Sequence, residues 1–207
     1  MLYSELQCSD AIHKAVERMG FAEMTEIQEK TIPVMMAGHD VIAKAPTGTG
    51  KTCAFGIPVA EHILPENKYP QAVIMAPTRE LAQQIAQELE ELTYFMPEVQ
   101  VACVYGGANM EKQAKRLAEG CQIVVATPGR LMDHYKHHSI DISHVTQIVL
   151  DEADEMLNMG FYKDVRHIIE MMKARKSLSM FSATISREVM DIGWLYQHNA
   201  EEITVQP

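Results

Sequence analysis

Two short stretches of the sequence carry residues whose types and spacing suit phosphate chemistry. The first, APTGTGKT at residues 45–52, follows an apolar run and places glycines directly before a lysine and a threonine. Such a turn lets several backbone N–H groups converge on one anion, the lysine reaches the terminal phosphates as a point charge, and the hydroxyl can ligate Mg²⁺. Alanine stands first, where the usual pattern has glycine, and is small enough to serve. We predict a nucleotide-binding loop made of Ala45, Pro46, Thr47, Gly48, Thr49, Gly50, Lys51 and Thr52.

The second stretch, IVLDEADEM at residues 148–156, gathers four carboxylates, at Asp151, Glu152, Asp154 and Glu155, behind an apolar run. One explanation is a solvated helix N-terminus, where the macrodipole favours acidic side chains. The other is a bound cation, which offsets their mutual repulsion. A triphosphate brings Mg²⁺, so we favour Asp151 and Thr52 as metal ligands and Glu152 as the group that polarises the attacking water. With Lys51 these two acids form the predicted catalytic set, while Glu155 is expected to be a solvated surface residue.

The bulk composition is that of one soluble globular domain. The chain has 207 residues, 47% hydrophobic and 22% charged, and no apolar run approaches the roughly 18 residues of a membrane span. The start, MLYSELQCSD, lacks the basic end and apolar core of a secretion signal. Four widely separated cysteines predict a reducing cytoplasm rather than disulfides or a zinc site.

The net charge bears on polyanion binding, and the histidine content bears on metal binding. The formal net charge of -10 argues against a general polyanion binder, because non-specific nucleic-acid binding needs clustered lysine and arginine. Among the 9 histidines, the run HYKHHS at residues 134–139 invites a metal interpretation. We favour exposed imidazoles in a loop or at a helix end.

The elements that must position these residues alternate along the chain. Runs typical of buried strands lie at 40–45, 72–76, 101–105, 123–127, 147–151 and 178–184, with a last strand in EEITVQP. Helical patterns lie at 51–64, 78–92, 109–120 and 162–175, and two more lie at about 9–19 and 25–35. This alternation predicts a single α/β domain with a mostly parallel sheet and helices on both faces.

Residues 151–154 spell Asp-Glu-Ala-Asp, the motif that names the DEAD-box RNA helicases, and residues 3–207 resemble the N-terminal RecA-like domain of that family. GFAEMTEIQ (20–28) resembles the adenine-reading segment of the family, and APTGTGKT its phosphate loop. PTRELA (77–82), the pair Gly106–Gly107 and TPGR (127–130) resemble its RNA-contacting elements, and SAT (182–184) its coupling element. The resemblance implies one RecA-like P-loop NTPase domain over residues 1–207, with residues 1–36 as an adenine-recognition extension.

Adenine recognition is assigned to Gln28 and Phe21. A glutamine amide can donate to and accept from the N7/N6 edge of adenine, which guanine does not match, and Phe21 can stack on the base. Without the phosphate loop nearby, Gln28 would be interpreted as a polar surface residue. Met24 stands where the family usually has proline.

The resemblance also assigns RNA and coupling roles. The implied RNA-binding residues are Pro77, Thr78, Arg79, Gly106, Gly107, Thr127, Pro128, Gly129 and Arg130. Contacts through backbone amides would explain how an acidic domain binds RNA, although Thr78 and Thr127 would also suit helix capping. The implied coupling residues are Asp154, Ser182, Ala183 and Thr184. Hydrogen bonds from Ser182 and Thr184 to Asp154 would link the nucleotide and RNA sides, and the alternative is that both cap the next helix.

Family members carry a second RecA-like domain that supplies arginine fingers, and nothing after Thr184 resembles it. We therefore expect a domain cut from a longer protein. The favoured interpretation is an ATP-dependent RNA helicase that binds ATP or ADP with Mg²⁺ and partners RNA and its own second domain. We expect it to be monomeric, without membrane contact, and nearly inactive as the isolated domain. The alternatives are an ATP-gated RNA clamp or chaperone and, third, a P-loop enzyme acting on a small molecule.

Overall fold

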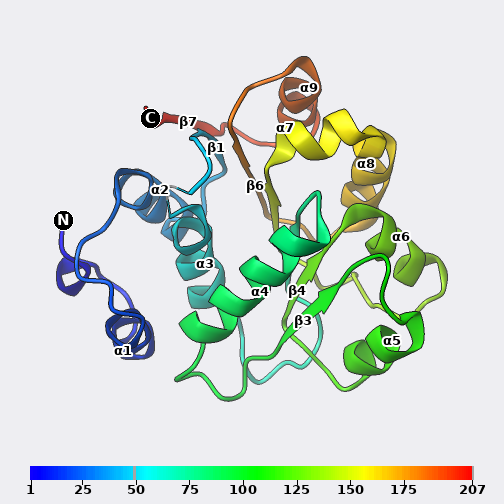
Figure 1. The fold of residues 1–207 in the computed structure, drawn as a ribbon, viewed down its shortest axis with the longest axis horizontal. Helices are drawn as coiled ribbons and strands as arrows, with labels where there is room; N and C mark the ends of the chain where they lie inside the picture. Colours follow the sequence, from blue (N-terminus) through cyan, green and yellow to red (C-terminus); the bar gives the residue numbers. More distant parts are fainter. Residues whose placement is uncertain (49, 207) are drawn as a thin grey trace.

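A parallel sheet runs through the centre of the computed structural model, which describes residues 1–48 and 50–206. In this described part, seven strands pair in the order β3-β4-β2-β5-β6-β1-β7. Figure 1 shows the sheet extending from β3 and β4 to β1 and β7, with helices around it. Every pairing is parallel, which confirms the predicted sheet. The strands are β1 (Val41–Lys44), β2 (Ala72–Met75), β3 (Val101–Val104), β4 (Ile123–Ala126), β5 (Gln147–Asp151), β6 (Ser177–Ser182) and β7 (Glu201–Thr204).

Helices cover both faces of the sheet. In β2, Ala72 and Ile74 pack into one apolar cluster, and the intervening Val73 and Met75 pack into another, because successive side chains point to opposite faces. The first cluster is closed by α1 (Asp10–Arg18), α2 (Glu26–Met36), α3 (Lys51–Glu61) and α4 (Arg79–Leu92). The second is closed by α5 (Met110–Ala118), α6 (Pro128–Lys136), α8 (Tyr162–Met171) and α9 (Arg187–Tyr196). Burial on both faces explains why the strands are apolar without alternation.

Three short helical segments complete the described elements: η1 (Tyr3–Glu5), α7 (Ala153–Met156) and a π-helical turn, η2 (Leu157–Phe161). The sequence prediction gave no range for η1, α6, α7, η2 or α9, although a helix beginning in the acidic stretch and a helix after Thr184 were among the alternatives considered. TPGR was assigned to RNA contact, with helix capping by Thr127 as the alternative, and in the structure Thr127 is the N-cap of α6 and Pro128 its first residue. Proline suits the first position of a helix, because the N–H it lacks would have no intrahelical partner there. No described helix is both long and apolar enough to cross a membrane.

The histidine run also differs from expectation at its first member. His134 in α6 is fully buried, whereas His137 and His138 are exposed as expected. Its Nδ1 lies 2.9 Å from Ser139 Oγ, and its Nε2 lies 3.1 Å from Gln113 Oε1. The prediction of an exposed imidazole at His134 was wrong, because α6 turns this side chain toward α5. In the described residues no cluster of three potential metal ligands is present.

The helix that follows the phosphate loop packs against α4 at a glycine. A Cβ added at Gly56 in α3 would lie 2.8 Å from Leu92 Cδ1 and 3.1 Å from Leu89 Cδ2. Both leucines are fully buried and have little room to move. Glycine at this position therefore lets α3 and α4 approach, which holds the helix after the phosphate loop against the helix that opens with PTRELA.

Candidate active site

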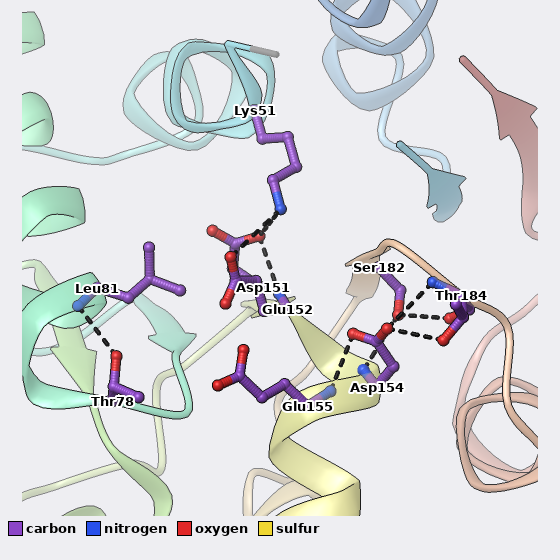
Figure 2. A network of polar contacts seen from close by, with 9 residues as sticks. All are labelled: Lys51, Thr78, Leu81, Asp151, Glu152, Asp154, Glu155, Ser182 and Thr184. Carbon is purple, nitrogen blue, oxygen red and sulfur yellow. Dashed lines mark hydrogen bonds and ion pairs between the residues drawn. The ribbon is translucent and has the colours of Figure 1, made fainter. Parts of the chain in front are cut away.

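The functional stretches meet at one edge of the sheet. Parallel strands all end at the same edge, and β5, β6 and β1 are adjacent, so Asp151, Ser182 and the loop after Lys44 converge there. Figure 2 shows Lys51 reaching down from α3 toward Asp151 and Glu152, with Asp154, Ser182 and Thr184 beside them. The strands thus bring the residues predicted for phosphate and metal binding close together at one sheet edge.

The phosphate loop has the backbone that its glycines predict. Gly48 and Gly50 have φ values of 77° and 83°, in the left-handed region where other residues are strained. Gly50 is also the N-cap of α3, and a Cβ there would lie 2.7 Å from Gln28 Nε2. Ala45 is buried, and its N–H donates to the Ser182 carbonyl at 2.9 Å, continuing the β1–β6 ladder with no positive φ. Alanine therefore suits a position where the usual pattern has glycine.

The rest of the predicted loop follows these residues. Pro46 is half-buried, Thr47 is exposed, and Thr52 is half-buried in the first turn of α3. Thr49 was also assigned to the loop and lies outside the described residues.

A buried ion pair joins the loop to the acidic strand end. Lys51 Nζ lies 3.3 Å from Asp151 Oδ1 and 4.0 Å from Glu152 Oε1. Lys51 is 7% exposed and Asp151 is 1% exposed, so the pair is shielded from water. Burial raises the pKa of Asp151, and the Lys51 ammonium opposes that shift. Among the described residues, the Lys51 ammonium has no acceptor with hydrogen-bond geometry.

This donor set fits a nucleotide phosphate with Mg²⁺. A buried ammonium without an aligned acceptor can turn to an anion at the N-terminus of α3, where backbone N–H groups already favour one. Asp151 and Thr52 supply the hard oxygen ligands that Mg²⁺ prefers. The residues present therefore suit both groups.

Glu152 has an uncommon backbone conformation and a raised pKa. Its φ of 48° and ψ of 51° lie in the left-handed region, which is uncommon for a residue other than glycine. Burial raises the pKa of Glu152 to about 7, a hydrogen bond with Glu155 adds to the shift, and Lys51 opposes it. Glu155 is exposed as predicted, yet it contributes to the protonation of its neighbour. A general base works best with a pKa near the working pH.

Asp154 joins α7 to the end of β6. Its carboxylate accepts the Thr184 hydroxyl at 2.7 Å and the Thr184 N–H at 3.1 Å, and its own N–H donates to Ser182 Oγ at 3.0 Å. Although burial raises the pKa of Asp154, hydrogen bonds from Thr184, Glu155 and Ser182 hold it below the usual value. The alternative that Ser182 and Thr184 cap the next helix is wrong, because Ser186 caps α9. Between them, Ala183 is exposed.

Gln28 is buried, not a polar surface residue. It is 4% exposed and forms a capping box with Thr25 at the start of α2. Gln28 Oε1 accepts the Thr25 N–H at 3.0 Å and also the Tyr3 hydroxyl, and Gln28 Nε2 donates to the Gly50 carbonyl at 3.2 Å. Three of the four hydrogen bonds that an amide can make are therefore satisfied within the protein. The amide joins the first turn of the chain to the phosphate loop.

Two residues beside Gln28 complete this region. Phe21 is 42% exposed, and its ring lies nearly parallel to that of Tyr3, with centroids 6.4 Å apart. Tyr3 was missed by sequence reasoning, since an isolated aromatic near the start of a chain carries no pattern. Met24, at the position where proline is usual, is buried and donates its N–H to the Met1 carbonyl.

The remaining predicted residues lie at the ends of β2, β3 and β4, farther along the same edge. Thr78 caps α4 by accepting the Leu81 N–H at 3.2 Å (Figure 2). Thr127 occupies the N-cap position of α6 without a capping bond from its side chain. Gly107 has a φ of 85°, whereas Gly106 has no positive φ and does not require glycine. Arg79 is exposed, Gly129 and Arg130 are half-buried, and the prolines Pro77 and Pro128 are buried.

A parallel sheet with a phosphate loop after β1 and an acidic pair at the end of β5 defines a RecA-like P-loop domain. The family model of the DEAD/DEAH box helicases matches residues 25–192, and the chain belongs to that family. It is 46% identical over 206 residues to "ATP-dependent RNA helicase CshA" of Limosilactobacillus reuteri, covering all of this chain and 41% of the relative. The protein of the same name from Listeria monocytogenes is also 46% identical to this chain, and the match covers 99% of this chain and 39% of that relative. The chain thus spans about two fifths of these relatives.

Solved structures show the same fold. A DEAD box protein from Methanococcus jannaschii superposes with a TM-score of 0.91 at 39% identity, covering 100% of this chain and 56% of that one. A hypothetical ATP-dependent RNA helicase from Sulfolobus tokodaii gives 0.88 at 39% identity, covering 95% of this chain and 57% of that one. Both of these neighbours are longer than this chain.

Proposed function

We propose that this chain is the ATP-binding domain of an ATP-dependent RNA helicase, in which ATP binding and hydrolysis drive RNA binding and local duplex unwinding. The observation that carries the proposal is the buried Lys51–Asp151 pair beside Glu152, set on one sheet edge with the loops after β2, β3 and β4. The names of the relatives support it. A second RecA-like domain would complete the enzyme, and these relatives are long enough to contain one.

The chemistry assigns a task to each group. Backbone N–H groups of the phosphate loop and the Lys51 ammonium would hold the phosphates, while Asp151 and Thr52 would hold Mg²⁺. When bound, Mg²⁺ neutralises charge on the phosphate oxygens. Glu152 would accept a proton from the attacking water at its carboxylate, for which a pKa of about 7 is suited. Asp154 would pass the state of this site to β6 through Thr184.

The surroundings that we propose for the protein rest on its free thiols. We propose a monomer in the cytoplasm. All four cysteines are free, and burial raises the pKa of Cys53 to about 12, which keeps that thiol protonated and unreactive. RNA would contact the domain mainly through backbone N–H groups, which offsets the formal net charge of -10.

The test separates binding from chemistry in the full-length protein. Lys51→Ala should weaken ATP binding roughly ten- to hundredfold, because the variant cannot make a charged hydrogen bond to the phosphates. Glu152→Gln keeps size and hydrogen bonding but removes the base, so ATP should bind normally while turnover falls about 10²–10⁴-fold. Titration calorimetry and an RNA-stimulated ATPase assay measure the two effects, with the exposed Lys44→Ala as control.

Two results would contradict the proposal. Normal turnover by Glu152→Gln would remove its role as the base. RNA binding and RNA-stimulated hydrolysis without strand separation would favour an ATP-gated RNA clamp instead.

A further inference from the structure

We propose that Gln113 is a positioning residue that holds the loops after β3 and β4 at a set spacing, so that they bind consecutive phosphates of one RNA strand. The inference rests on the proposed function, because it assumes that these loops contact RNA. Gln113 belongs to none of the motifs that mark the site. It lies in α5, the helix that follows the Gly106–Gly107 loop.

The Gln113 carboxamide joins three segments. The side chain is 8% exposed, and its Nε2 donates to the Tyr105 carbonyl at 3.0 Å, one residue before the Gly106–Gly107 pair. Its Oε1 accepts from Arg130 Nη1 at 3.1 Å and lies 3.1 Å from His134 Nε2. One buried amide thus ties the exit of β3 to the first two turns of α6.

Arg130 provides a second tie between the same loops. Besides Gln113, its Nη1 donates to the Ala108 carbonyl at 3.0 Å, directly after the glycine pair. Its Nε lies 3.7 Å from Asp133 Oδ2, and the side chain is 12% exposed. The guanidinium is therefore held by protein groups, and it fixes where the backbone N–H groups of the loop point.

The ties extend to the loop after β2 through Tyr105. The guanidinium of Arg79 lies over the Tyr105 ring, 4.7 Å from its centroid, and Gln83 Nε2 donates to the Tyr105 hydroxyl at 3.0 Å. Contacts therefore run from β2 through β3 to β4, along the edge where we propose that RNA lies. Backbone contacts to phosphates act only when their spacing matches that of the strand, so a loop displaced by about 1 Å binds much more weakly.

A simpler interpretation is that Gln113 only satisfies buried polar groups, as most buried side chains do. Gln122 offers a matched comparison. It is fully buried directly before β4, accepts the Gln100 N–H at 2.7 Å, and donates to the carbonyls of Pro65 at 3.0 Å and Glu98 at 2.9 Å. It makes as many hydrogen bonds as Gln113 but at the opposite end of the strand, away from the loops.

The experiment compares Gln113→Met with Gln122→Met in the full-length protein. Methionine has a similar length and removes all three bonds in both cases. We would measure anisotropy of a fluorescein-labelled single-stranded oligouridine with adenylyl imidodiphosphate and Mg²⁺ present, across a salt series, together with analogue affinity and thermal unfolding. Tyr105→Leu, at a half-buried position, tests the tie to the loop after β2 with less risk to folding, because it removes the contacts to Arg79 and Gln83 and keeps the main-chain carbonyl that accepts from Gln113.

We expect both methionine variants to unfold at lower temperature and to bind the analogue normally. Gln113→Met alone should weaken RNA binding roughly tenfold at each salt concentration, while the slope of log affinity against log salt stays nearly the same, because neutral backbone N–H contacts release no counterions. Tyr105→Leu should weaken RNA binding severalfold. Unchanged RNA affinity in Gln113→Met, or an equally weakened affinity in Gln122→Met, would overturn the inference. No RNA binding by the unmutated protein would overturn the proposed function itself.

Discussion

The choice between adenine and guanine is assigned to one side-chain amide, that of Gln28. Because its Oε1 is shared by the Thr25 N–H and the Tyr3 hydroxyl, pairing with adenine requires at least one of these contacts to yield. The amide is held close to the phosphate loop by the Gly50 carbonyl, so a base bound beside that loop would lie within its reach. The buried network therefore places the amide and also limits its freedom.

We predict that ATP and ADP bind more tightly than GTP and GDP, by about 1–3 kcal/mol if the amide pairs with the base at two atoms. Gln28→Ala should abolish the difference. Tyr3→Phe should retain it, because the amide remains and Thr25 still orients it. Titration of the four nucleotides into each variant measures this, and equal affinities for both bases in the unmutated chain would contradict the assignment.

We predict that His134 makes stability depend on pH. Burial lowers its pKa below the ordinary value of 6.5, Arg130 and His137 lower it further, and Asp133 opposes them. Between the folded and the ordinary pKa the unfolded chain binds more protons, so stability rises with pH up to about 6.5 and is lost as pH falls below it. The stability advantage of the unmutated chain over His134→Gln should therefore shrink on acidification. Urea unfolding at a series of pH values measures it, and a constant difference would contradict the shift.

The close contact between α3 and α4 sets a requirement at the scale of elements. Gly56→Val would place two or more carbon atoms against the buried Leu89 and Leu92, at a cost of about 1–3 kcal/mol in unfolding free energy. Gly193→Ala in α9 is the control, because its Cβ would meet only the Gln197 side-chain oxygen at 3.1 Å and Met180 Cε at 3.5 Å. There alanine should be neutral or stabilising, by up to about 1 kcal/mol of helix propensity. Equal effects of the two changes would show that α3 and α4 can separate.

The elements divide into two groups along one sheet edge. The ends of β1, β5 and β6 carry the phosphate loop, the acidic pair and the Asp154 contacts, and the ends of β2, β3 and β4 carry the loops proposed for RNA. Strands β2 and β5 are hydrogen-bonded neighbours at the boundary. The two groups of loops therefore lie on one continuous sheet.

For the whole molecule, we predict that this chain binds nucleotide but is nearly inert as a motor. In the described residues the ion pairs at the phosphate site involve Lys51 and no arginine, while an arginine finger contributes about 10³–10⁵ in rate. These 207 residues tested alone should bind RNA weakly, because they would supply only one side of the proposed two-domain groove. Hydrolysis should be slow, little stimulated by RNA, and without unwinding. Covalent addition of a second RecA-like domain should restore all three activities, and robust RNA-stimulated turnover by this chain alone would refute the two-domain mechanism.

The sequence by itself determined the strands and the phosphate loop, because residues close together in the chain set both. Apolar runs bounded by turn residues predicted every strand, because a strand covered on both faces must be apolar throughout. Gly48, Gly50 and Lys51 predicted the phosphate loop, since turn geometry and helix termini act within a few residues. Local sequence did not predict where α6 begins, because Pro128 and Gly129 suit a turn as well as a first helical turn.

Only the tertiary structure decided which side chains share a site. Tyr3 and Gln28 meet across 25 positions of sequence, and Asp154 and Thr184 across 30. Such contacts depend on the order of strands in the sheet and on how the helices pack, neither of which a local pattern encodes. Gln113 is the clearest case, because a glutamine in a helix predicts nothing until α5 and α6 lie side by side and bury it between two loops.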